Sequence, residues 1–284
     1  MKLLDLTISA LKNAYEVHEK LGKNGLEKLK KNRFGETALR GDFQAEEAVL
    51  NVLRVKKVPI RVISEEHGVV DIVKNPVLLG ILDGLDGSNR YEAYWKGDKN
   101  ARYGTMFAIF DSINPRYEDY LTSGIMEHPT KRLFIAAKGR GAFLVSLTNS
   151  AKSGIEVSKE TDFSNKTKVE IDAYEKAAHF PFIKRVFIER LPKGINFKCL
   201  LSTAVHYADL ASGAADIVLE CTYKGNLESA VAYGLVTEAG GVMVDINGES
   251  FSKKRYLEFG QKEHVPIITA ATKELADSFI KTIS

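Results

Sequence analysis

The sequence predicts a mixed α/β protein, and three observations support this fold class. Segments with apolar residues at helical spacing alternate with short apolar segments over residues 168–239, which is typical of α/β proteins. A continuous apolar run at residues 76–82, bounded by Pro and Gly, indicates a strand buried on both faces. The chain has 284 residues, so we expect one large or two medium domains.

The first half of the chain combines helices with a series of strands. Residues 3–31 carry apolar side chains at helical spacing and predict one long helix, which Gly22 and Gly25 interrupt near its end. Residues 42–54 predict a second helix with Asp42 as its N-cap. Further elements follow from local patterns: strands at 59–63, 73–82, 103–111, 124–127 and 133–137, and a tight turn at 139–143.

Residues 145–168 are polar and weakly patterned, which makes them the best candidate for a domain boundary. We therefore expect an N-terminal α+β domain over residues 1–148 and a C-terminal α/β domain over residues 149–284. In the second domain the patterns predict strands at 168–171 and 217–219, and helices at 182–191, 204–212 and 228–239.

The composition is that of an ordinary globular protein, with 44% hydrophobic and 27% charged residues. The 40 basic and 37 acidic residues are scattered, so the basic groups within 28–31 and 253–255 indicate solvated surface rather than a nucleic-acid interface. The apolar neighbours of Cys199 and Cys221 predict buried thiols and a reducing compartment. The sequence shows no signal-peptide pattern and no apolar run of membrane-spanning length, so we expect a cytoplasmic protein.

The most informative motif follows the strand predicted at 73–82 and reads Asp-Gly-Leu-Asp-Gly-Ser over residues 83–88. Asp83 and Asp86 lie at a strand end that turns at glycine, so their carboxylates can point into one small volume. Converging carboxylates repel one another unless a hard cation lies between them, and oxygen ligands favour Mg²⁺ or Mn²⁺. The N–H groups of residues 87–89 suit a phosphate if a helix begins there. The motif indicates phosphoester chemistry; the alternative is an Asp–Gly turn of local origin.

Further acidic residues occur where other predicted elements begin or end. Glu65 and Glu66 follow the strand at 59–63, and Glu228 begins the helix at 228–239. Their structural alternatives are a solvated side chain for Glu66 and a favourable charge–dipole interaction for Glu228. Combined with the two aspartates, these residues match a phosphatase that uses several metal ions.

Two other residues are candidates for activating water in such a site. A carboxylate at Asp42 and a hydroxyl at Ser88 can align and deprotonate an attacking water. The N-cap role of Asp42 is an equally good interpretation, and the two roles are compatible.

Four segments, in order along the chain, then carry a resemblance: Gly41–Gln44 with Glu46 or Glu47, Ile63–Gly68, Asp83–Ser88, and Leu227–Ala230 with Thr237–Gly241. They resemble motifs of the inositol monophosphatase family, within the lithium-sensitive sugar-phosphatase superfamily that includes fructose-1,6-bisphosphatases. The Gly-Arg-Gly-Ala-Phe turn at 139–143 is also similar to one in that family. The resemblance covers about residues 40–248.

The resemblance implies a layered αβαβα sandwich of the sugar-phosphatase type, often assembled as a homodimer. It implies Mg²⁺-dependent hydrolysis of a small polyol or sugar phosphate, with inositol 1-phosphate and fructose 1,6-bisphosphate as the leading substrates. Two or three Mg²⁺ ions, replaceable by Mn²⁺, would bind to Glu65, Asp83, the backbone carbonyl of Leu85, Asp86 and Glu228.

The same resemblance assigns roles around the substrate. Asp42 and Ser88 would position the attacking water, and the Gly87 and Ser88 amides would bind phosphate. Glu220, after the strand predicted at 217–219, would contact substrate hydroxyls. The expected partner is a small phosphate ester, and neither nucleic acid nor a membrane.

Several departures from the family pattern leave alternatives open. Gly84 replaces a proline, and Leu227–Glu228 replaces a Trp–Asp pair. The extra methylene of Glu228 moves a carboxylate by about 1.5 Å, which is large for an ion that demands near-octahedral ligands. The segment 220–228 is also one residue longer than expected. One alternative is a catalytically weakened homologue that binds metal or phosphate as a structural or regulatory dimer; another is a 3′-phosphonucleotide or NADP(H) phosphatase.

Overall fold

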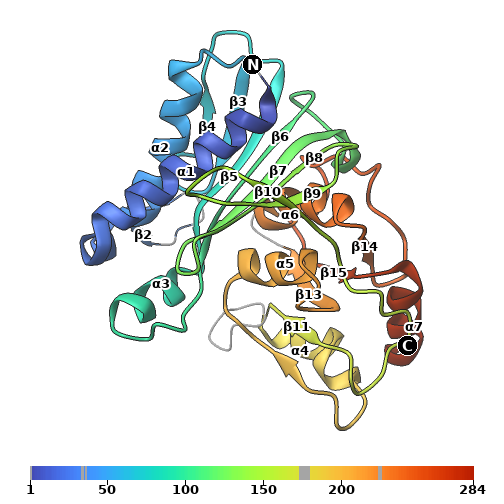
Figure 1. The fold of residues 1–284 in the computed structure, drawn as a ribbon. Helices are drawn as coiled ribbons and strands as arrows, with labels where there is room; N and C mark the ends of the chain where they lie inside the picture. Colours follow the sequence, from blue (N-terminus) through green and yellow to red (C-terminus); the bar gives the residue numbers. More distant parts are fainter. Residues whose placement is uncertain (1, 33–34, 36, 173–179, 223–225) are drawn as a thin grey trace.

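The computed structural model describes residues 2–32, 35, 37–172, 180–222 and 226–284, and it confirms the layered αβαβα arrangement (Figure 1). Helices α1 (Leu3–Leu21) and α2 (Arg40–Val55) cover one face of an eight-stranded sheet. Helices α5 (Thr203–Ala211) and α6 (Leu227–Glu238) lie between that sheet and a five-stranded sheet. Helices α4 (Phe180–Val186) and α7 (Lys273–Ile283) cover the outside of the smaller sheet.

The larger sheet has the strand order β10-β9-β8-β7-β6-β5-β3-β4, in which β3 and β5 are parallel and all other neighbours are antiparallel. Its strands are β3 (Ile60–Ser64), β4 (Val69–Asp71), β5 (Leu78–Asp86), β6 (Gly104–Phe110), β7 (Tyr120–Glu127), β8 (Arg132–Ala137), β9 (Ala142–Val145) and β10 (Lys152–Ile155).

The smaller sheet has the order β12-β11-β13-β15-β14, with β11 parallel to both β12 and β13. Its strands are β11 (Val169–Ile171), β12 (Phe197–Lys198), β13 (Ile217–Thr222), β14 (Val242–Asp245) and β15 (Val265–Ala270). The remaining elements are the hairpin β1 (Lys28–Lys31) and β2 (Thr37–Leu39), helix α3 (Ser88–Trp95), and the 3₁₀ turns η1 (Gly22–Leu26), η2 (Tyr117–Asp119) and η3 (Ile188–Arg190).

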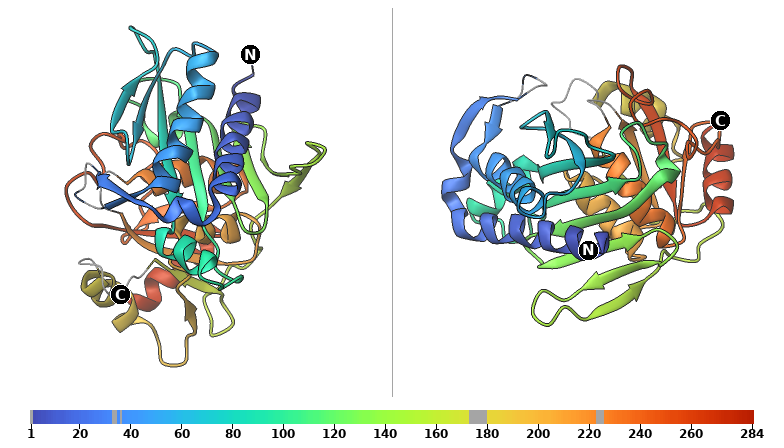
Figure 2. Two further views of the ribbon diagram at one scale, coloured as in Figure 1. Left: turned by 90° about the vertical axis from the view of Figure 1, so that its left-hand side faces the viewer. Right: turned by 90° about the horizontal axis from the view of Figure 1, so that it is seen from above.

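Strand β5 is buried on both faces, as the apolar run at 76–82 predicts. Leu79 and Ile81 of β5 belong to the core that surrounds α5 and α6, whereas Leu82 belongs to the core beneath α1 and α2. Alternate residues of one strand therefore contribute to two separate cores. Figure 2 shows α1 and α2 side by side over this sheet.

A carboxylate at the end of α6 connects two motifs noted in the sequence. Glu238 accepts hydrogen bonds from the N–H groups of Gly139 (2.7 Å), Arg140 (3.1 Å) and Gly141 (2.7 Å), and from the hydroxyl of Tyr120 (2.8 Å). Gly139 and Gly141 have φ angles of 69° and 83°, which favour glycine. The Gly-Arg-Gly turn and the Glu-Ala-Gly-Gly segment are thus parts of one structural clamp.

The prediction of one long helix over residues 3–31 is wrong. α1 ends at Leu21, Gly22 follows with φ 51°, and residues 28–31 pair with β2. The turn between them is fixed by a distant side chain, because the Tyr91 hydroxyl donates to the Gly22 carbonyl (2.8 Å). A Cβ at Gly25 would lie 1.9 Å from the same hydroxyl oxygen, so the segment accepts Tyr91 only with glycine there.

Three smaller differences concern element ends. Asp42 is not the N-cap of α2, because that helix begins at Arg40 and Leu39 precedes it. β5 spans Leu78–Asp86 rather than 73–82, so the Asp-Gly-Leu-Asp motif lies within the strand. The helix expected at 182–191 is divided into α4 and η3.

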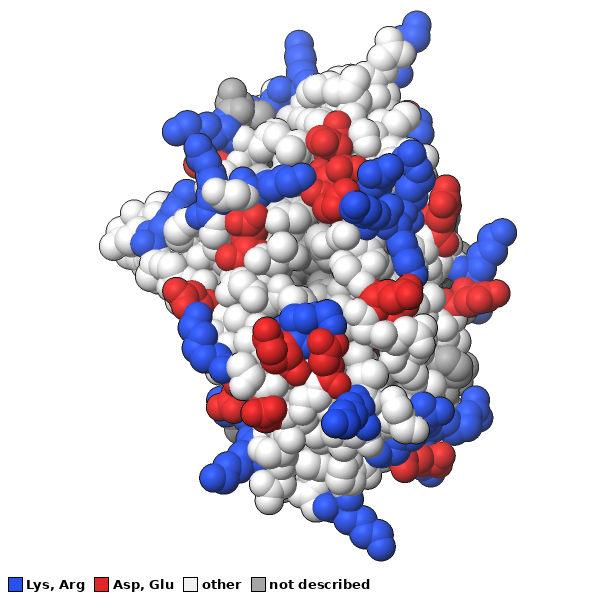
Figure 3. Space-filling view, turned by 90° about the vertical axis from the view of Figure 1, so that its right-hand side faces the viewer, with Lys and Arg blue, Asp and Glu red and all other residues white. Residues whose placement is uncertain are grey.

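Other expectations concern surfaces and boundaries. Residues 28–31 and 253–255 are exposed, as predicted, and on the side of the molecule in Figure 3 basic and acidic side chains are interspersed. Cys221 is buried, whereas Cys199 is half-buried. The boundary between residues 148 and 149 falls in the turn that joins β9 to β10 and remains a prediction. Among the described residues, no helix combines the length and apolarity needed to cross a bilayer.

Candidate active site

The site begins at the carboxyl ends of two parallel strands. β3 and β5 pair in parallel with Ser64 opposite Leu82. Glu65, directly after the end of β3, is therefore a neighbour of Asp83, which lies within β5. Asp83 is 1% exposed, so its carboxylate lies inside the protein.

A bulge in β5 turns the second aspartate toward the first. Asp83 pairs with Met106 and Asp86 pairs with Gly104, so three steps along β5 match only two along β6. In a regular strand, residues three apart face opposite sides of the sheet. The extra residue removes that difference, and Asp83 and Asp86 point into one space.

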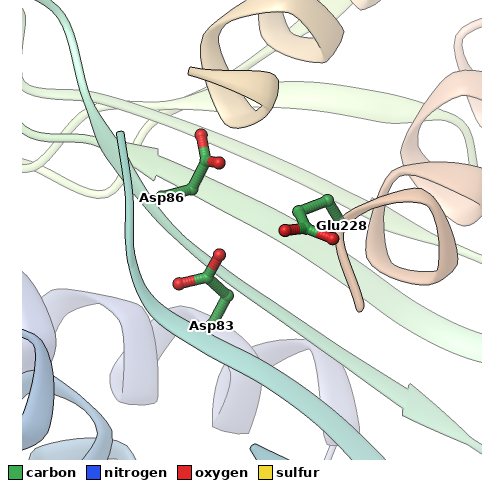
Figure 4. A group of neighbouring side chains, drawn as sticks. All are labelled: Asp83, Asp86 and Glu228. Atoms are coloured by element: carbon green, nitrogen blue, oxygen red, sulfur yellow. The ribbon is translucent and has the colours of Figure 1, made fainter. Parts of the chain in front are cut away.

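Glu228, in the first turn of α6, completes a cluster with these aspartates (Figure 4). One oxygen each from Asp83, Asp86 and Glu228 lie within 4.8 Å of one another. Mg²⁺ binds oxygen ligands at about 2.0–2.1 Å, so opposite ligands are roughly 4.2 Å apart. The spacing and the all-oxygen donor set thus fit a hard divalent cation, and the longer Glu228 side chain reaches the cluster.

The electrostatics of these carboxyl groups also fit a cation. Burial, and then the charges of Glu65 and Asp86, raise the pKa of Asp83 well above its usual value. Burial and the charge of Glu228 raise the pKa of Asp86 to about 7. Each charged carboxylate therefore destabilises the others, and a divalent cation between them reverses the sign of that interaction.

Asp86 is oriented by the start of α5. Its Oδ2 accepts hydrogen bonds from the Ser202 hydroxyl (2.5 Å) and from the Ala204 N–H (2.7 Å). The next residue, Gly87, has φ 89°, and a Cβ there would lie 2.9 Å from Cβ of Ser202. The glycine thus lets β5 turn into α3 directly against the loop that orients Asp86.

The segment after β3 is fixed by Glu46 of α2. The Glu46 carboxylate accepts the N–H groups of Glu65 (3.0 Å), Glu66 (3.1 Å) and His67 (3.0 Å). Asn32 donates to the carboxylates of Glu65 (3.2 Å) and Glu66 (3.0 Å). The sequence interpretation gave Glu46 no such role, although its position one helical turn after Asp42 was a usable signal.

Asp42 lies beside Gly84, and Ser88 lies beside the Leu85 carbonyl. Asp42 is 4% exposed, and its Oδ1 has no hydrogen-bond partner within the described residues. Burial, and then the charges of Glu65 and Asp83, raise its pKa well above the usual value. Ser88 is exposed at the start of α3, and its hydroxyl donates weakly to the Leu85 carbonyl (3.4 Å). In the described part of the chain, no hydrogen bond joins Asp42 to Ser88.

The start of α3 offers donors for an anion. Within the described residues, the first backbone bond of this helix is donated by Arg90 to the Gly87 carbonyl (2.8 Å). The preceding N–H groups, of Ser88 and Asn89, therefore remain available at the positive end of the helix.

The smaller sheet contributes a second acidic edge. Ile171 of β11 pairs in parallel with Leu219 of β13, which makes Asp172 and Glu220 neighbours. Glu220 accepts a hydrogen bond from the Tyr207 hydroxyl. Burial, and then the charges of Glu228 and Asp172, raise its pKa well above the usual value. Sequence reasoning missed Asp172, although an acid directly after a predicted strand was the signal that identified Glu65.

Comparison with known proteins identifies a family model and a sequence relative that match nearly the whole chain. A family model described as the inositol monophosphatase family matches residues 2–284. The chain is 26% identical over 283 residues to a fructose-1,6-bisphosphatase/inositol-1-monophosphatase of Thermococcus kodakarensis, a match that covers 96% of this chain and 95% of that protein.

A plant protein and a solved structure extend the comparison. The chain is 29% identical over 220 residues to a probable 3′(2′),5′-bisphosphate nucleotidase 4 of Arabidopsis thaliana, covering 72% of this chain. It spans only 57% of the length of that relative. The extragenic suppressor protein suhB of Bartonella henselae has the same fold, with a TM-score of 0.76 at 17% identity over 100% of this chain and 99% of that one.

Proposed function

This chain belongs to the inositol monophosphatase family, and we propose from that membership and from its acidic cluster that it is a Mg²⁺-dependent phosphomonoesterase. Its substrate is a small polyol or sugar phosphate, with inositol 1-phosphate and fructose 1,6-bisphosphate as the first candidates. One observation carries the proposal: oxygens of Asp83, Asp86 and Glu228, which come from distant parts of the chain, lie within 4.8 Å of one another.

In this proposal, the metal ligands are Glu65, Asp83, the Leu85 carbonyl, Asp86 and Glu228. They provide for two or three Mg²⁺ ions, and Mn²⁺ can replace them. Mg²⁺ bound there supplies positive charge that offsets the negative charge of a phosphate ester. The raised pKa values of Asp83 and Asp86 support this assignment, because buried like charges in such a group need a cation.

The other residues act on the substrate and on water. The N–H groups of Gly87 and Ser88 bind the phosphate oxygens, and Glu220 accepts a hydrogen bond from a substrate hydroxyl. Asp42 accepts the proton of the attacking water, a role that its raised pKa supports. The exposed Ser88 hydroxyl orients that water.

A 3′-phosphonucleotide phosphatase is the second candidate function. The observation that favours it is the 29% identity to a plant protein named as a probable bisphosphate nucleotidase. The third candidate is a catalytically weakened homologue that binds metal or phosphate, which the Gly84 and Glu228 departures favour.

Phosphate release tests the proposal directly. The purified chain is assayed with inositol 1-phosphate, fructose 1,6-bisphosphate and 3′-phosphoadenosine 5′-phosphate, with Mg²⁺ and with a chelator. We expect Mg²⁺-dependent release from at least one of the first two. Release from the nucleotide alone favours the second candidate, and no release from any substrate favours the weakened homologue.

Two variants test whether phosphate release depends on the acidic cluster. Asp83→Asn removes a buried charge of the cluster and should abolish turnover without loss of fold. Asp245→Asn is the matched control, because Asp245 is also a buried aspartate (9% exposed) but lies on β14 of the other sheet. Full activity in Asp83→Asn, or equal loss in both variants, contradicts the assignment.

We also propose that the protein is a cytoplasmic homodimer. Sedimentation equilibrium of the purified chain tests the assembly, and a single species with the monomer mass of 31.5 kDa contradicts it.

A further inference from the structure

The peptide group between Gly84 and Leu85 connects the acidic cluster to the protein interior. Its N–H, on Leu85, donates to Oδ1 of Asp83 (2.9 Å). Its carbonyl, on Gly84, accepts from the Thr105 hydroxyl (2.7 Å) and contacts Nε2 of His18 (3.2 Å). The C=O and N–H of a trans peptide point in opposite directions in one rigid plane, so the direction of the carbonyl determines the direction of the N–H.

The donors on the carbonyl side belong to two different elements. Thr105 is on β6, and His18 is in the last turn of α1; both are buried. Thr105 also contacts Nε2 of His128 (2.9 Å). The His18 and His128 rings lie 4.3 Å apart, with each Nδ1 buried and without a hydrogen-bond partner among the described residues.

The contacts determine the tautomer of both histidines. A carbonyl oxygen only accepts, so His18 donates to Gly84 through Nε2–H. Thr105 gives its one proton to the same carbonyl and therefore accepts from Nε2–H of His128. Burial favours neutral rings whose Nδ1 atoms carry no proton: it lowers the pKa of His18 to about 4 and that of His128 well below its usual value, and neither Nδ1 has a partner among the described residues.

We propose that Thr105 and His18 are positioning residues for Asp83, acting through the Gly84–Leu85 peptide group. They fix the carbonyl, the rigid plane then fixes the Leu85 N–H, and that N–H orients the Asp83 carboxylate. The inference rests on the proposed function in one respect, namely that Asp83 is a metal ligand. Groups that hydrogen-bond directly to a ligand commonly change metal affinity about 10–100-fold. Thr105 and His18 act through one intervening peptide group, so we expect an effect at the lower end of that range.

The packing around Gly84 explains why hydrogen bonds, and not a rigid residue, hold the Gly84–Leu85 peptide group in place. A Cβ at Gly84 would lie 2.6 Å from the Asp42 carbonyl oxygen and 2.7 Å from Asp42 Oδ1. A proline, or any other side chain, is therefore excluded by the close approach of α2. This part of β5 lacks a stiff residue at position 84, and the hydrogen bonds to the Gly84 carbonyl restrict it instead.

Thr105→Val tests the inference, because valine has the shape of threonine and lacks the hydroxyl. Thr105→Ser restores the hydroxyl. Thr122→Val is the matched control: Thr122 is a buried threonine of the neighbouring strand β7, and its hydroxyl bonds to Thr7 (2.7 Å) rather than to Gly84. Each variant is titrated with Mn²⁺ alone, followed by electron paramagnetic resonance, and its melting temperature is measured with and without Mg²⁺.

We expect Thr105→Val to weaken Mn²⁺ binding about 10-fold or more and to reduce the Mg²⁺-induced rise in melting temperature. Thr105→Ser should stay within about 3-fold of the unmodified protein, and Thr122→Val should lose stability but keep its Mn²⁺ affinity. Unchanged Mn²⁺ affinity in Thr105→Val, or an equal loss in Thr122→Val, overturns the inference.

Asp83→Asn distinguishes a wrong positioning role for Thr105 and His18 from a wrong proposed function. If Asp83→Asn loses Mn²⁺ binding while Thr105→Val keeps it, only the positioning role is wrong. If Asp83→Asn also keeps full Mn²⁺ affinity, the metal site itself is wrong. A ¹⁵N spectrum adds a direct check, since a His18 ring protonated on Nδ1 instead of Nε2 could not donate to Gly84.

Discussion

Replacing Asp86 with asparagine should stabilise the metal-free protein at neutral pH while it weakens the response to Mg²⁺. The pKa of Asp86 is raised from 3.8 to about 7 by burial and by Glu228. The folded protein therefore retains a proton that the unfolded chain releases above pH 4. Because the folded pKa is higher, stability falls as the pH rises from about 4 to about 7.

The magnitude follows from that shift. One pKa unit corresponds to about 1.4 kcal/mol, so an interval from 3.8 to about 7 amounts to about 4 kcal/mol at pH 7. Asparagine carries no charge, and its Oδ1 can still accept from Ser202 and Ala204, which now bond to Oδ2 of Asp86. The variant should therefore gain most of this energy at pH 7 and almost none at pH 4.

Urea unfolding in a chelator, at pH 4, 5.5 and 7, measures the difference between the two proteins. Adding Mg²⁺ at pH 7 should then stabilise the unmodified protein more than the variant, because the cation reverses the repulsion at Asp86. Equal stabilities at all three pH values would refute the electrostatic account. Equal stabilisation by Mg²⁺ would refute the role of Asp86 as a ligand.

Three further predictions address other residues. Glu228→Ala should raise the Mg²⁺ concentration needed for half-maximal phosphate release. An unchanged Mg²⁺ titration would mean that Glu228 only interacts with the dipole of its own helix. Glu170→Gln should stabilise the protein by about 3 kcal/mol at pH 7 and not at pH 4.5, since burial raises the pKa of Glu170 from 4.5 to about 8. Urea unfolding measures this difference, and the same change in the free energy of unfolding at both pH values would contradict the prediction. Glu238→Ala should lower the free energy of unfolding by roughly 2 kcal/mol, because three N–H groups lose a charged acceptor; the same loss in the exposed control Glu258→Ala would remove that explanation.

The sequence was sufficient where a local pattern determines the structure. The apolar run before Asp83 predicted a strand buried on both faces, and the acids after two predicted strands were found at one edge of the sheet. Parallel pairing explains that success, since it brings the carboxyl ends of β3 and β5 together whatever lies between them in the chain.

The remaining features depend on contacts between distant residues. The turn after α1 is held by Tyr91, whose hydroxyl bonds to the carbonyl of Gly22, 69 residues away in the chain. The bulge between Asp83 and Asp86 is set by pairing with β6, and the Gly84 carbonyl is bonded by His18, 66 residues before it. No periodicity encodes such contacts. Helix α7 is a different case, because it was missed although Leu275 and Phe279 lie at helical spacing after the N-cap Thr272.

The clamp at Glu238 has a consequence for the opposite end of its helix. Glu238 follows Glu228 by ten residues in α6, so the turn bonded to Glu238 lies roughly 15 Å along the axis from the first turn, where Glu228 is. A helix anchored at its far end resists sliding along its own axis. We therefore expect substitutions in the 139–141 turn to change the metal affinity of the proposed site without altering any of its proposed ligands.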